Sequence, residues 1–63
     1  YLDTAGWIYF KLGHVQLARE LIDRSLSINP ENAEVLMHMG DVLEYLGKSN
    51  EAYIYYMRAD KLR

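Results

Sequence analysis

Apolar and small side chains recur along the chain at spacings of three and four residues, which is the period of an amphipathic helix. One such stripe covers about residues 1–12 and another covers about residues 33–46. A glycine follows each stripe at once, Gly13 in the first case and Gly47 in the second. Because glycine readily takes the left-handed backbone that closes a helix, both positions are predicted to be turns between antiparallel helices.

A second pair of helices fits about residues 15–28 and about residues 49–62. Both carry small residues at helical spacing, which allow two helices to approach closely. Pro30 stops the earlier of these helices, and Asn32 is placed to cap the next one. Glu34 then puts a favourable negative charge in the first turn. The chain is therefore predicted to form two helical hairpins separated by a short linker.

The two hairpins are also repeats of each other. A shift of 34 positions aligns identical residues: Leu2 with Leu36, Gly6 with Gly40, Leu12 with Leu46, Gly13 with Gly47, Ala18 with Ala52 and Arg24 with Arg58. Similar residues fall between them: Ile8 on Val42, Tyr9 on Leu43, Ile22 on Tyr56, Ser25 on Ala59 and Ile28 on Leu62. These positions are mainly apolar or small, so we expect them to form the packed core.

The period and the repeated residues resemble those of the tetratricopeptide repeat family. The family signature is matched by Leu2, Ala5, Gly6, Tyr9, Gly13, Ala18, Ile22, Ser25 and Pro30, and then by Leu36, Met39, Gly40, Leu43, Gly47, Ala52, Tyr56 and Ala59. The resemblance covers the whole chain and implies an all-α fold. Repeats at residues 1–32 and 33–63 would be two helix-turn-helix hairpins, stacked as a short right-handed α-solenoid of four antiparallel helices. His14 and Lys48 stand where an acidic helix cap is usual, which weakens capping.

Composition narrows the classes of function. The chain has 63 residues, of which 51% are hydrophobic and 25% charged, with a net charge of −2 and no Cys. These values fit a small folded domain of marginal stability and exclude a disulfide framework, a thiolate zinc site and a basic nucleic-acid surface. The longest apolar run, residues 53–57, is far below the roughly 20 residues of a membrane span. We expect a soluble chain, cytoplasmic or periplasmic if bacterial, cut from a longer protein because it begins with Tyr1.

The resemblance implies that the first helix of each hairpin lines a concave surface. It assigns ten residues to this surface: Asp3, Trp7, Phe10, Lys11, Glu34, Met37, His38, Asp41, Glu44 and Tyr45. The apolar members would anchor a ligand, and the carboxylates outnumber Lys11. The expected partner is therefore a peptide or helix with apolar anchors and basic groups. Alternatively, the aromatic residues are ordinary hairpin packing and the carboxylates are a solvated face.

Some relatives grip the C-terminal carboxylate of chaperones through Lys, Asn and Arg side chains. This chain has Asp3 and Trp7, and then Glu34 and His38, at the corresponding positions. A carboxylate clamp is therefore not expected here.

The last helix has consecutive large side chains at residues 53–57, which point all around its axis. A helix that is apolar all around usually packs against other elements on every side. Terminal repeats normally need a polar outer face. Self-association is therefore a second hypothesis, in which the chain is a structural or assembly segment of a longer solenoid that oligomerises through this helix. Its candidate residues are Tyr53, Tyr55, Tyr56 and Met57. Alternatively, the tyrosine hydroxyls reach water and the rings lie flat on the surface.

Nothing in the sequence predicts catalysis or a cofactor. It has no paired nucleophile and base, no glycine-rich phosphate loop and no histidine-containing metal motif. Glu34, His38 and Asp41 share one helical face, but such spacings usually give only modest helix support, so no metal site is expected. The leading hypothesis is a non-enzymatic protein-interaction module.

Overall fold

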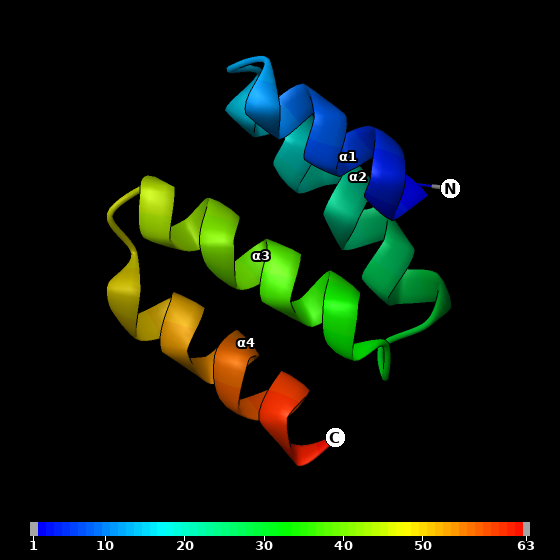
Figure 1. Ribbon diagram of the computed structural model, residues 1–63, viewed down its shortest axis with the longest axis vertical. Helices are drawn as coiled ribbons and strands as arrows, with labels where there is room; N and C mark the ends of the chain where they lie inside the picture. The colour runs from blue at the N-terminus through cyan, green and yellow to red at the C-terminus, as the bar shows by residue number, and fades with distance from the viewer. Residues whose placement is uncertain (1, 63) are drawn as a thin grey trace.

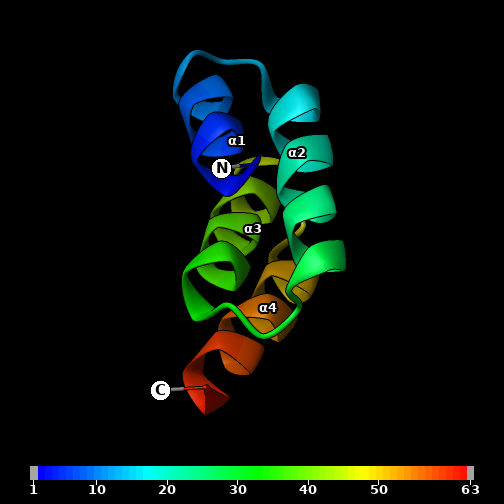
Figure 2. The same cartoon turned by 90° about the vertical axis from the view of Figure 1, so that its right-hand side faces the viewer.

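Four helices form the chain in a computed structural model, which describes the backbone of residues 2–62 and the side chains of residues 4–62. The helices are α1 (Leu2–Lys11), α2 (Val15–Ile28), α3 (Ala33–Tyr45) and α4 (Ser49–Lys61). α1 pairs with α2 and α3 pairs with α4, each as an antiparallel hairpin, and the hairpins stack so that α3 lies between the first hairpin and α4 (Figure 1). Viewed at right angles, α1 and α3 lie toward one side of the molecule and α2 toward the other (Figure 2).

The two hairpin turns have the same construction. Gly13 has a φ of 90° and Gly47 a φ of 79°, both in the left-handed region that favours glycine. In the first turn the His14 amide donates to the Tyr9 carbonyl over 2.9 Å, and the Gly13 amide donates to the Phe10 carbonyl over 3.0 Å. This hydrogen-bond pattern is a Schellman motif, so the predicted role of both glycines is confirmed.

The helix starts differ in how they are capped. The Asn32 side chain accepts hydrogen bonds from the amides of Glu34 and Val35, at 3.1 and 3.3 Å, and so caps α3. His14 and Lys48 make no side-chain cap for α2 and α4, as their departure from the usual acidic residue predicts. The first turns of these two helices therefore lack the side-chain hydrogen bonds that Asn32 supplies to α3.

The core runs through the junction between the hairpins. Ile22 and Leu26 of α2 cluster with α3 side chains and with two small residues of α4, Ala52 and Ala59. The largest fully buried side chains are Ile22, Leu36, Met39, Val42 and Leu43. α3 has buried residues on two faces because it lies between α2 and α4.

Two glycines allow the helices of each hairpin to approach closely. A Cβ at Gly6 would lie 2.9 Å from the Ile22 side chain, and a Cβ at Gly40 would lie 2.5 Å from the Tyr56 ring. Both gaps are shorter than a carbon–carbon van der Waals contact. The repeated glycines are therefore fixed by packing.

Several positions of the predicted core are exposed instead, among them Ile8, Tyr9, Leu12, Ile28 and Leu62. Tyr9 and Leu12 are exposed, although their repeat equivalents, Leu43 and Leu46, are buried or half-buried. The physical reason is that α3 has a helix on each side, whereas α1 packs extensively only on α2.

Among the described helices, none is both long and apolar enough to cross a bilayer.

Candidate functional site

A row of aromatic rings crosses from α1 to α3. The Trp7 indole stacks on the His38 imidazole, with ring centroids 4.2 Å apart and an angle of 13° between the planes. Trp7 also stacks on Phe10, at 5.3 Å, and Phe10 meets the Tyr45 ring edge-on at 5.6 Å. We call His38, Trp7, Phe10 and Tyr45 the aromatic row. It joins the two hairpins through side chains that the family resemblance assigns to the concave surface.

Members of the aromatic row differ in their access to solvent. Trp7, Phe10 and His38 are half-buried, and Phe10 packs against the core. Tyr45 is 69% exposed at the end of the row. The inner rings therefore contribute to packing between the hairpins, while most of the Tyr45 side chain is exposed to solvent.

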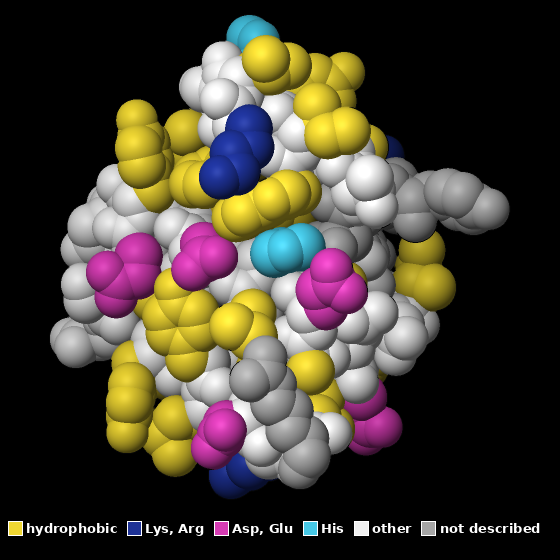
Figure 3. Space-filling model, in the orientation of Figure 1, with side chains coloured by type: hydrophobic (Ala, Val, Ile, Leu, Met, Phe, Trp, Pro, Cys, Tyr) yellow, Lys and Arg dark blue, Asp and Glu magenta, His cyan; other side chains and the backbone are white. Residues whose placement is uncertain are grey.

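Charged side chains lie beside the aromatic row, with a positive charge on α1 and negative charges on α3. The Lys11 ammonium lies 5.0 Å from the Trp7 ring centroid, within the range of a cation–π contact. Glu34 and Glu44 are exposed on α3. Figure 3 shows hydrophobic side chains extending from α1 over α3 on this face, with acidic side chains along α3. The face is thus apolar at its centre and mainly acidic along α3.

Asp41 bonds to the last helix instead of extending into solvent. Its carboxylate accepts a hydrogen bond of 2.5 Å from the Tyr56 hydroxyl, which ties α3 to α4. This contact joins one predicted concave residue to one predicted self-association residue, and sequence reasoning missed it. No pattern in the sequence indicates this pair, because Asp41 and Tyr56 are 15 residues apart on different helices.

The environment of Tyr56 makes stability depend on pH in the alkaline range. Burial, the hydrogen bond to Asp41 and the negative charges of Asp41 and Glu44 raise the pKa of Tyr56 to about 12. The folded chain therefore holds the phenolic proton more tightly than the unfolded chain, in which the tyrosine pKa is about 10.

We expect the free energy of unfolding to fall as pH rises from about 10 to about 12, because this stabilisation exists only while Tyr56 is protonated. Urea unfolding at a series of pH values measures the slope. Tyr56→Phe removes the hydroxyl and should make the slope shallower. An identical slope in both proteins would contradict this account of the hydrogen bond.

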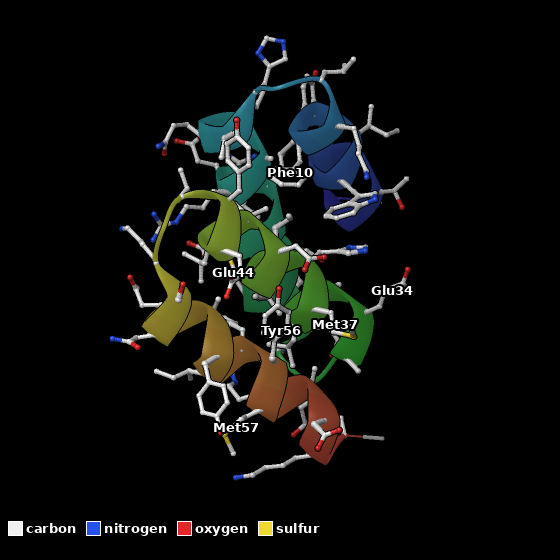
Figure 4. All side chains as sticks on the ribbon, turned by 60° about the vertical axis from the view of Figure 1, so that its left-hand side comes forward. Phe10, Glu34, Met37, Glu44, Tyr56 and Met57 are labelled. Atoms are coloured by element: carbon white, nitrogen blue, oxygen red, sulfur yellow. The ribbon has the colours of Figure 1, made fainter. Side chains whose placement is uncertain are left out.

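Met37 lies apart from the aromatic row, in a groove between α3 and α4. We call this the α3–α4 groove; it has a volume of about 450 Å³ and is lined by Met37, Tyr53, Tyr56, Met57, Ala59 and Asp60. Met37 and Tyr56 face the space between the two helices, while Glu34 extends away from the ribbon (Figure 4). The predicted concave residues are therefore divided between two surfaces.

The candidate residues of the last helix also separate. Tyr53 and Met57 are exposed, whereas Tyr55 and Tyr56 are half-buried and pack against the core. The Arg58 guanidinium lies 5.3 Å from the Tyr55 ring centroid. The side chain of Asp3, another predicted concave residue, lies outside the described part of the chain. Within the described part, no three His, Cys, Asp or Glu side chains are arranged to hold a metal ion.

Comparison with known proteins matches two tetratricopeptide repeat models to the chain in tandem. One covers residues 1–32 and the other covers residues 33–63. The chain belongs to the tetratricopeptide repeat family. This confirms the resemblance and agrees with the two helical hairpins of the structure. Tetratricopeptide repeats are in general protein-interaction modules and not catalysts.

A curated relative supports the same family. The chain is 37% identical over 57 residues to a TPR repeat-containing protein of Methanocaldococcus jannaschii. The match covers 90% of this chain and 10% of the relative. The chain therefore spans about a tenth of the length of the curated relative that it matches.

Proposed function

We propose that the chain binds a peptide or helix across α1 and α3, at the aromatic row. The main support for this proposal is the position of Tyr45. Its side chain is largely exposed, and it lies at the end of a stack of rings that holds its neighbour Phe10 in place. A preorganised aromatic side chain gives a large contact area at little cost in conformational entropy, as in the energetic centres of many protein interfaces.

The charges beside the row support a partner that carries basic groups. Glu34 and Glu44 are exposed on α3, while Lys11 lies against Trp7. Rim charges of this kind contribute mainly to association rate and selectivity, and their effect falls with added salt. The proposed ligand therefore combines large apolar side chains with Lys or Arg, and its association should slow as salt is added.

Two tyrosines of similar exposure provide a matched test. Tyr45 is 69% exposed on α3 and Tyr53 is 63% exposed on α4. Tyr45→Ala should lower the affinity for a selected peptide by about tenfold, because it removes the proposed anchor. Tyr53→Ala should leave the affinity unchanged, because Tyr53 lies outside the row.

The binding can be followed directly on the proposed surface. Trp7 is the chain's single tryptophan, so indole emission reports on the aromatic row. A peptide library rich in Lys, Arg and large apolar residues supplies the ligands. Equal losses of peptide affinity for Tyr45→Ala and Tyr53→Ala, or no loss of affinity for either variant, would contradict the proposal.

A second candidate function is self-assembly through the last helix. It is favoured by the exposure of Tyr53, Ile54 and Met57 on α4. Exposed apolar side chains of this size, gathered on one helix, are typical of an interface. Replacing both Tyr53 and Met57 by Lys should then convert an oligomer into a monomer, and an unchanged mass would argue against this candidate.

A further inference from the structure

A second groove lies where the linker between the hairpins meets the end of α4. It has a volume of about 330 Å³ and is lined by Pro30, Glu31, Leu36, Arg58, Lys61 and Leu62. We call it the linker groove. Its walls come from both hairpins, so the groove is an internal junction of the chain and is complete without a further repeat.

The linker groove and the aromatic row lie on different sides of α3. Leu36 is 1% exposed and forms the floor of the groove. His38 of the aromatic row follows two residues later, and each residue of an α-helix is rotated by about 100° from the one before it. The two side chains therefore leave α3 about 200° apart. A ligand in the linker groove would leave the aromatic row free.

The linker groove carries positive charge although the chain as a whole is acidic. Arg58 and Lys61 are exposed one helical turn apart on α4, and Glu31 is the one acidic residue among the lining residues that the structure describes. Within residues 4–62, neither cation forms an ion pair. The Arg58 guanidinium lies 5.3 Å from the Tyr55 ring centroid, a cation–π contact that restricts its orientation. The net charge of the chain is −2, so this groove is a local exception.

The equivalent face of the first hairpin has a different character. The shift of 34 residues pairs three positions on the outer faces of α2 and α4: Glu20 with Ile54, Arg24 with Arg58 and Ser27 with Lys61. On α2, Glu20 and Arg24 line the same shallow depression, so opposite charges lie together. On α4 the carboxylate is replaced by Ile54, which is 56% exposed, and a second cation is added. The face of α4 is therefore apolar and basic where that of α2 is polar and mixed in charge.

We propose that the linker groove binds a segment of another protein in which Asp or Glu residues lie between large apolar side chains. One apolar side chain enters the groove above Leu36 and beside Leu62, which is 44% exposed. The carboxylates meet Arg58 and Lys61 in charge-assisted hydrogen bonds. A second apolar side chain reaches Ile54, one turn before Arg58 on the same face. The partner therefore has the opposite charge from the one proposed for the aromatic row.

The shape of the groove favours a protein segment over a lipid surface. Binding to anionic lipid usually uses a cluster of about four to eight Lys or Arg residues. The described lining of the groove supplies Arg58 and Lys61. Its floor, Leu36, is buried, so a ligand must insert a side chain to reach it. A peptide meets that requirement, and a flat headgroup layer does not.

Charge reversal at two equivalent arginines tests the electrostatic half of the proposal. Fluorescein-labelled peptides with Asp or Glu around Leu or Phe serve as probes, and fluorescence anisotropy gives their affinity. Arg58→Glu should weaken binding by about tenfold or more, because it opposes the ligand carboxylates directly. Arg24→Glu makes the same change in net charge at the equivalent exposed position of α2 and should leave the affinity nearly unchanged. Circular dichroism checks that both variants are folded.

The apolar half has its own matched pair of variants. Leu62→Ser removes an apolar wall of the linker groove and should weaken binding of the same peptides. Ile28→Ser makes the corresponding change at the equivalent position of α2, which is 77% exposed and outside the groove, and should not. An unlabelled basic and apolar peptide, selected for the aromatic row, should fail to displace the acidic probe.

Several results would overturn the proposal. Equal losses for Arg24→Glu and Arg58→Glu would mean that the probe responds to overall charge and not to the groove. Displacement by the basic peptide would place the acidic probe on the aromatic row. Self-association of the wild-type chain that Arg58→Glu alone abolishes would make a second copy the occupant. Binding to vesicles of anionic lipid, without binding to any acidic probe at millimolar concentration, would make the groove a lipid site.

Discussion

Ile22→Ala should leave most of the chain unfolded at 25 °C. Ile22 is 0% exposed and joins α2 to α3 in the core, so the substitution opens a cavity where the two hairpins meet. Removing a buried Ile side chain costs ~2–5 kcal/mol. A chain of this size has a total stability of only about 3–5 kcal/mol, so the loss is comparable to the whole.

The same helix offers a matched control. Ile28 is 77% exposed at the end of α2, so Ile28→Ala should change the free energy of unfolding by no more than about 0.5 kcal/mol. Urea titrations followed by circular dichroism measure both variants. Similar losses at the two positions would mean that the junction between the hairpins does not hold the fold.

Trp7→Ala should lower the affinity for a selected peptide by roughly thirtyfold or more, the usual effect of removing a central aromatic anchor. Trp7 is the middle of the aromatic row, in contact with His38, Phe10 and Lys11. Its loss removes contact surface and also frees Phe10, which positions Tyr45. Trp7→Phe keeps an aromatic ring and should lose much less. Because both variants lack the indole, calorimetry is the appropriate measurement.

This pair of variants decides between the two interpretations of the aromatic row. If the rings serve only to pack α1 on α3, Trp7→Ala lowers the free energy of unfolding and leaves the affinity of the folded molecules unchanged. If they anchor a ligand, the affinity falls at temperatures where the variant is still folded. Measuring stability and affinity on the same preparation separates the two effects.

The fold was predictable because local and repeated signals agree. Helical spacing of apolar residues, a glycine after each first helix and a proline between the units all indicate the same four helices. The left-handed glycines Gly13 and Gly47 confirm the turns, and Asn32 confirms the cap of α3. Each of these features depends on a few neighbouring residues, which is why the sequence alone indicates them.

Contacts between helices were less accessible from the sequence. Helical spacing shows that the side chains of residues 53–57 point all around the axis of α4, but it does not show that the Tyr56 hydroxyl reaches Asp41. It likewise pairs Ile8 with Val42 as equivalent positions, while only the stacking order of the helices explains why one is exposed and the other buried. Side-chain partners across helices depend on tertiary geometry, and a one-dimensional pattern does not contain it.

The most direct test of the proposed peptide surface is a map of backbone amide chemical shifts, recorded by NMR while a selected basic and apolar peptide is added to the chain. The account predicts shifts concentrated in α1 and α3 around Trp7, Phe10 and Tyr45, with small changes in α2. Shifts confined to α2 or α4, or no shifts with any peptide of this class, would contradict it.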